Sequence, residues 1–236
     1  ADMIEIPAGT FVMGSATGAV DERPEHTVQL DTYWIDKYEV STVQYQACVD
    51  AGTCEPTGTT AGCNSVANER SDHPINCLNW AQADTYCLWA QKRLPTEAEW
   101  ERAAKGNGRR PFPWGREAPS RDLLNFNNNV GSTTRVGSYP LGISPFGLHD
   151  MSGNVQEWIR DFYAADYYAG SPTSNPQGPT EGVLRVVRGA SWKLGIPQEV
   201  LTTTVRFAFV PSTRDPSLGF RCATDTHVSY THLRAH

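Results

Sequence analysis

Residues 149–158 read HDMSGNVQEW and follow the pattern of neither a helix nor a hairpin. Ser152, Gly153 and Asn154 favour a turn, and Gly-Asn in the middle of a helix costs stability. A two-residue hairpin turn does not need an acid at each end of the stretch. Asp150 and Glu157 therefore lie either on a solvated surface turn or on a loop that wraps a positive charge.

The composition indicates a globular domain rather than a membrane or nucleic-acid-binding chain. The chain has 236 residues, 39% of them apolar, with 20 Gly and 16 Pro, which favours many turns and short elements. Its formal net charge is −6 and it has no run of Lys or Arg, so nucleic acid is not an expected partner. No segment approaches the roughly 20 apolar residues of a membrane span.

Local patterns predict about three helices and several short strands. Capping boxes, in which the N-cap residue and the residue three positions later satisfy each other's backbone, lie in segments 41–52, 79–92 and 93–106. Apolar alternation or short apolar runs predict strands within 6–15, within 26–41 (two strands or one bent strand), within 183–192 and within 218–223. We therefore expect a single α+β domain over residues 1–226, with much ordered loop.

The last ten residues, HVSYTHLRAH (227–236), fit nothing that precedes them. They resemble translated adapter sequence from metagenomic assemblies of bacterial DNA. We interpret them as a non-native tail and leave them out of the fold prediction.

Six cysteines indicate a disulfide-bonded protein in an extracytoplasmic setting, that is, periplasmic, surface-attached or secreted. Four of them lie between residues 48 and 77, and none of these four belongs to a C-x-x-C pair, so a zinc site is the weaker interpretation. The six are Cys48, Cys54, Cys63, Cys77, Cys87 and Cys222.

Six motifs in a fixed order resemble one known family. They are IPAGTFVMGS, KRLPTEAEWERAAKG, FPWG, FGLHDMSGNVQEW, VVRGASW and GFRCA. Together they resemble the formylglycine-generating-enzyme domain, also called the sulfatase-modifying-factor domain. The resemblance implies that family's variant of the C-type-lectin-like fold, which is loop-rich and binds calcium.

The resemblance also implies a reaction whose key residues this chain lacks. The family's oxidases convert a sulfatase cysteine to formylglycine with two copper-binding cysteines, which would fall here at Leu194 and near Glu199, with a one-residue slip allowed. No cysteine lies between Cys87 and Cys222. Copper(I) takes thiolate or thioether ligands, so we expect neither bound copper nor any catalytic residue of the known oxidase mechanism.

Two calcium sites follow from the same resemblance. The first would use Asp150, the carbonyls of Gly153 and Val155, and Glu157, oxygen ligands of the kind that calcium prefers. The second would begin with the Asn125 side chain and the Phe126 carbonyl, in a shorter loop than in some family members. The competing interpretations are a solvated turn at the first site and an Asn-rich turn at the second.

The resemblance pairs Cys87 with Cys222, which would tie the second predicted helix to the last strand. The other four cysteines allow three pairings. Of these we favour Cys48–Cys54 across a helix end and Cys63–Cys77 across the following loop.

We interpret the chain as a catalytically inactive family member that serves as a calcium-stabilised binding or scaffold module. Its recognition surface would lie near Trp192, Lys193, Leu194 and Arg206, and its ligand would be a protein, a peptide or a glycan. For Arg206, a structural salt bridge competes with an anion-binding role and is favoured. The alternative is an enzyme: a sulfatase-modifying oxidoreductase with displaced ligands, or another chemistry on this fold.

Overall fold

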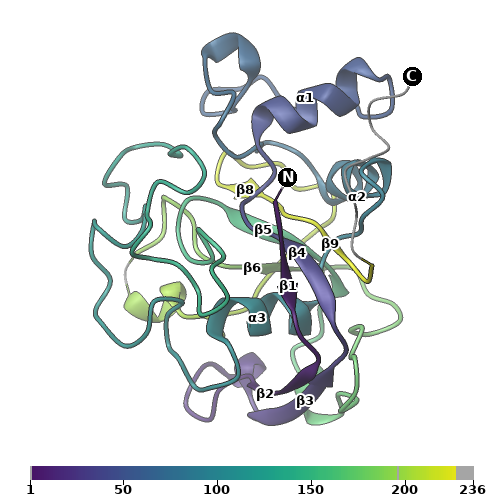
Figure 1. The fold of residues 1–236 in the computed structure, drawn as a ribbon, viewed down its shortest axis with the longest axis vertical. Helices are drawn as coiled ribbons and strands as arrows, with labels where there is room; N and C mark the ends of the chain where they lie inside the picture. The colour runs from purple at the N-terminus through teal and green to yellow at the C-terminus, as the bar shows by residue number, and fades with distance from the viewer. Residues whose placement is uncertain (1, 196, 227–236) are drawn as a thin grey trace.

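The computed structural model describes residues 2–195 and 197–226 as short strands and helices joined by long loops (Figure 1). Within these residues the α-helices are α1 (Thr42–Asp50), α2 (Trp80–Trp89) and α3 (Glu97–Lys105). Single 3₁₀ turns are η1 (Val20–Glu22), η2 (Val66–Asn68), η3 (Tyr167–Ala169) and η4 (Gln198–Leu201). The tail predicted at 227–236 lies outside the described residues.

The strands of this part of the chain form three small sheets. One is antiparallel, in the order β1 (Met3–Ile6), β4 (Tyr33–Asp36), β9 (Ala223–Thr224). The second pairs β2 (Gly9–Met13) with β3 (His26–Leu30). The third has the order β7 (Phe207–Phe209), β6 (Arg185–Arg188), β5 (Gln156–Phe162), β8 (Leu218–Gly219), with β5 and β8 parallel.

The expected α+β, loop-rich class is confirmed, and the helices begin where capping boxes predicted them. At α3, the Thr96 hydroxyl accepts from the Glu99 N–H at 3.3 Å, while Glu99 accepts from the Thr96 N–H at 2.8 Å. Sequence patterns missed β5, the strand that begins within the opening motif. Its first four residues, two of them polar, are all buried, so no alternation of polar and apolar residues marks it.

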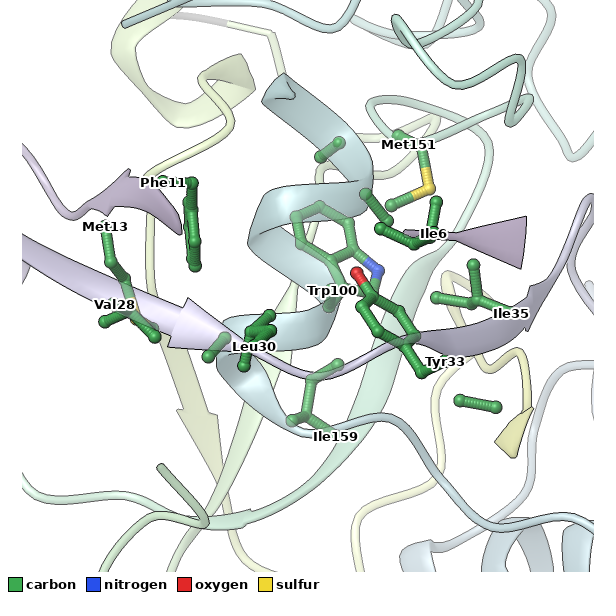
Figure 2. Close-up of a cluster of buried hydrophobic side chains, with 14 of the residues drawn as sticks. Ile6, Phe11, Met13, Val28, Leu30, Tyr33, Ile35, Trp100, Met151 and Ile159 are labelled. Atoms are coloured by element: carbon green, nitrogen blue, oxygen red, sulfur yellow. The ribbon is translucent and has the colours of Figure 1, made fainter. Parts of the chain in front are cut away.

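The largest core cluster surrounds α3. Trp100 is fully buried, and Figure 2 shows it among side chains of the N-terminal strands together with Met151 and Ile159. The helix contacts β2 and β3 as well as β5 and β6. It therefore joins the N-terminal hairpin to the sheet that carries the candidate site.

Three disulfides use all six cysteines, which confirms the predicted pairings and excludes the zinc interpretation: Cys48–Cys54, Cys63–Cys77 and Cys87–Cys222. The last bridge joins α2 to the segment between β8 and β9 across 135 residues. On chain-entropy grounds a loop of that length stabilises the fold by about 5 kcal/mol, against about 2 kcal/mol for the shortest bridge. Among the described helices, none has the length and apolar character needed to cross a membrane.

Candidate functional site

The loop before β5 turns through left-handed backbone conformations. The φ angles are 57° at Asp150, 94° at Gly153 and 61° at Asn154. A Cβ on Gly153 would lie 2.7 Å from the Asn125 carbonyl oxygen, so only glycine allows the two loops to approach this closely. The turn predicted from Ser152, Gly153 and Asn154 is therefore a packing requirement as well as a local preference.

Backbone hydrogen bonds connect three segments, residues 125–129, 150–157 and 191–194. We call this unit the three-loop junction. The Asn154 N–H donates to the Asn125 carbonyl at 2.9 Å, and the Trp192 N–H donates to the Asn154 carbonyl at 2.8 Å. The Asn128 N–H in turn donates to the Trp192 carbonyl at 2.7 Å. Both predicted calcium loops and most of the predicted recognition surface thus meet at this junction.

The carboxylate of Glu157 has a partner that differs from the prediction. It is fully buried, and it accepts from Arg221 Nε at 3.0 and 2.8 Å, from Arg221 Nη2 at 2.7 Å and from the Trp100 indole N–H at 2.8 Å. In this structure the guanidinium of Arg221 is therefore the cationic partner of Glu157. The role of Glu157 as a calcium ligand stays a prediction.

The acid beside Asp150 is Glu39, which the sequence analysis missed. Both side chains are buried, and Glu39 Oε2 has no hydrogen-bond partner among the described residues. Desolvation raises the pKa of Asp150 to about 6, and it raises the pKa of Glu39 well above its usual range, with the charge of Asp150 adding to the effect. No sequence signal marked Glu39, because it lies more than a hundred residues away in a segment with no motif.

The second predicted loop carries two buried amide oxygens that lack partners. Within the described chain neither Asn125 Oδ1 nor Asn129 Oδ1 accepts a hydrogen bond, although Asn125 Nδ2 donates to the Ser132 carbonyl at 2.8 Å. The Phe126 carbonyl accepts from the Asn129 N–H at 3.0 Å, which leaves one of its lone pairs. Unpaired buried amide oxygens are costly, and they are ligands that calcium accepts.

Oxygens of the kind that calcium accepts therefore lie at both predicted sites. At the second site Asn125, Asn129 and Phe126 offer neutral oxygens, and at the first site Asp150 and the neighbouring Glu39 offer carboxylates. Among residues 2–195 and 197–226, no group of three or more His, Cys, Asp or Glu side chains is arranged so that it could hold a metal ion. Any ion here would rely largely on amide, carbonyl and water oxygens.

Of the two positions expected for copper-binding cysteines, Leu194 is apolar and Glu199 is charged. Leu194 and Val200 pack against a small buried cluster, whereas Glu199 is exposed. The cluster consists of Phe112, Leu123, Leu124, Ala190 and Leu201. Since every cysteine of the chain is in a disulfide, no thiolate is available at this place.

The predicted recognition surface does not form as expected. Arg206 is buried, and it donates to both oxygens of Glu97 at 2.7 and 2.9 Å, so its role is the structural salt bridge. Its assignment to a binding surface is wrong. Lys193 is exposed and pairs with Asp215 at 2.8 Å, while Trp192 and Leu194 are half-buried.

A cleft of about 750 Å³, which the prediction did not include, lies beside residues 199–205. Its other walls come from the loop after β2, the end of α3 and residues 109–116. Ala16, Val200 and Val205 contribute apolar surface, and Arg110 and Glu199 contribute charges of both signs. No sequence pattern marks this cleft, because the segments that form its walls are far apart in the chain.

Comparison with known proteins agrees with the six motifs. The family model described as sulfatase-modifying factor enzyme 1-like domain matches residues 1–226. The chain is 34% identical over 94% of its length to serine/threonine-protein kinase pkn1 of Chlamydia caviae, of which it spans only 38%. It is 32% identical over 96% of its length to the formylglycine-generating enzyme of Streptomyces coelicolor, of which it covers 90%. The solved structure of PvdO from Pseudomonas aeruginosa has a TM-score of 0.81 and 27% identity, covering 95% of this chain and 94% of that one.

Replacing Arg221 by Met should lower the free energy of unfolding by about 3–5 kcal/mol, because it leaves Glu157 buried without its counter-charge. Urea denaturation followed by tryptophan fluorescence measures this change. Lys193→Met breaks the exposed pair with Asp215 and serves as the matched control, with an expected loss below about 1 kcal/mol. Equal losses in the two variants would contradict the central role of Arg221.

Proposed function

This chain belongs to the sulfatase-modifying factor family, and from that premise we propose that it is a catalytically inactive member that serves as an extracytoplasmic binding module. The observation that carries the proposal is that neither Leu194 nor Glu199, where the resemblance places the copper-binding cysteines, offers a thiolate. Leu194 packs against an apolar cluster, as does Val200 one residue beyond the exposed Glu199. Copper(I) requires soft sulfur ligands, and neither aliphatic side chains nor a carboxylate offers one. The rest of the scaffold is retained, so the fold keeps its shape without that chemistry.

We propose the cleft beside residues 199–205 as the recognition site and a polypeptide segment as its ligand. The volume of about 750 Å³ lies within the range of small-ligand and peptide-anchor pockets. An apolar lining suits one anchoring side chain of the ligand, while Arg110 and Glu199 suit the charged groups on either side of it. Loops held by a rigid scaffold are a common basis for such recognition.

Calcium belongs to the proposal as a stabiliser of the three-loop junction. Asn125 is the best-supported ligand, since its buried side-chain oxygen has no other described partner. Asp150 and Glu39 would gain from a nearby cation because burial disfavours the ionised form of both carboxyl groups. A bound calcium ion would supply positive charge at the three-loop junction, and the backbones of the loops would position its ligands.

The extracytoplasmic location is supported by the disulfides. Three bridges that use every cysteine are typical of proteins that fold in an oxidising compartment. Two of them hold the segment between α1 and α2, which has only a single 3₁₀ turn as regular structure.

Inactivity can be tested by copper titration and by product analysis. The unmodified protein, with its disulfides intact, should bind no stoichiometric Cu(I) against a chromogenic chelator. It should also form no aldehyde on a peptide carrying a sulfatase motif, as read by mass spectrometry. Leu194→Cys/Val200→Cys should acquire Cu(I) binding, whereas the matched Leu194→Ser/Val200→Ser should not. Stoichiometric copper binding with turnover by the unmodified protein would overturn the proposal.

The cleft can be tested with peptides selected by display on the immobilised protein. Ala16→Trp fills the cleft and should weaken the selected peptides at least about tenfold in fluorescence anisotropy, because it removes the anchoring volume. Ala51→Trp, at the exposed end of α1, is the matched control and should leave affinity unchanged. Peptides that bind Ala16→Trp as well as the unmodified protein would place recognition elsewhere.

Calcium should raise the melting temperature, and EDTA should lower it. With calcium present in 100-fold excess over its Kd, the expected stabilisation is about 2.7 kcal/mol. Asn125→Ala should remove most of this response in differential scanning fluorimetry. Asn125→Asp, which keeps an oxygen and adds a charge, should retain or strengthen it. A melting temperature that ignores both calcium and EDTA would exclude the ion.

A further inference from the structure

A second pocket, with a volume of about 320 Å³, lies between α1 and the loop that follows it. In Figure 1, α1 lies at the top of the molecule, while β2 and β3, next to the cleft described above, lie at the bottom. None of the residues that line the pocket belongs to the three-loop junction or to the cleft. It is therefore a separate candidate binding site.

The lining of this pocket carries no charged side chain. Hydroxyl and amide groups supply its polar surface, notably those of Thr57, Thr59 and Gln46, while Val49 and Ile75 supply apolar surface. An ionised ligand would lose its hydration without gaining a counter-charge, which is costly. A neutral ligand with several hydroxyl groups would meet both donors and acceptors.

Several of these polar groups are available to a ligand. The hydroxyls of Thr57 and Thr59 make no side-chain hydrogen bond to another described residue. Gln46 uses its Nε2 to donate to Asp50 at 2.8 Å, which leaves its amide oxygen as an acceptor toward the pocket. The pocket thus presents hydroxyls and an amide oxygen beside aliphatic carbons, a combination that suits the polar edges and C–H faces of a sugar ring.

The walls of the pocket are held rigid by covalent and buried contacts. Cys48–Cys54 fastens the start of the loop to α1, and Cys63–Cys77 fastens its later part. Asn64 is buried, donates to the Pro74 carbonyl at 2.7 Å and accepts from Arg70 at 3.1 Å. The Tyr45 hydroxyl donates to the Glu55 carbonyl at 2.9 Å. A wall fixed in advance lowers the entropy cost of binding a small ligand.

We propose that this pocket binds a neutral sugar residue, presented singly or at the end of a glycan. Its volume is at the lower end of the range of about 300–1,000 Å³ for small-molecule sites, which suits one monosaccharide. The uncharged lining selects against acidic sugars. The proposal does not depend on the inactivity of the domain or on peptide recognition in the cleft.

Titration of the ¹⁵N-labelled protein with the methyl glycosides of glucose, galactose, mannose and N-acetylglucosamine tests this proposal. At least one glycoside should produce saturable shifts confined to amides of residues 42–75. Methyl glucuronide should produce none, because its carboxylate finds no partner in the pocket. Failure of all four neutral glycosides, or saturable shifts elsewhere only, would overturn the proposal.

Variants give the second part of the test. Thr57→Val keeps the shape and removes one hydroxyl, so it should weaken sugar binding about fivefold or more. Thr180→Val, at an exposed position outside the pocket, is the matched control and should bind as the unmodified protein does. Ala16→Trp should also leave sugar binding unchanged, which separates this site from the cleft. Unaltered affinity in Thr57→Val would contradict the assigned site.

Discussion

The buried contact between Arg221 and Glu157 is the interaction on which the rest of the structure depends. Arg221 donates not only to Glu157 but also to the Asp36 and Lys37 carbonyls at 3.1 and 3.2 Å, and to the His149 carbonyl at 2.9 Å. One side chain thus joins the end of β4, the loop before β5 and the C-terminal segment. Trp100 connects α3 to the same group of segments, because its indole N–H donates to Glu157. A buried ion pair is favourable only when its remaining hydrogen-bonding groups are satisfied, and here that requirement fixes the mutual positions of four segments.

The contacts that hold the candidate site together are mainly backbone contacts. The three-loop junction is built from backbone hydrogen bonds and from the close approach that Gly153 allows. Neither depends on the side chains at 194 and 200. Leu194 and Val200 instead pack against a small core cluster. The loops around the junction are held by disulfides and packing, which is the kind of support that recognition loops require.

The sequence predicted the elements whose signals are local. The three helices begin at capping boxes that span four residues each, and the two short-range disulfides are the pairing that was favoured among three. Sequence patterns missed β5, because a strand that is buried on both faces shows no alternation of polar and apolar residues. Two of its buried residues are polar, so it is not a continuous apolar run either. In the candidate site, the left-handed turn at Gly153 and Asn154 was predictable, whereas Glu39 and the cleft walls were not. These come together only when distant segments pack.

The sequence by itself determined that the chain has no thiolate where the oxidase reaction needs one, since a missing residue type cannot be supplied by folding. It also determined the family through six ordered motifs, and the helix starts through contacts between near neighbours. Only the tertiary structure decided which partner each buried charge receives. Glu157 pairs with Arg221, 64 residues away, and Arg206 pairs with Glu97, 109 residues away. The reason is physical: a buried charge is stabilised by whatever the complete packing brings within hydrogen-bonding distance, and local sequence does not encode that distance.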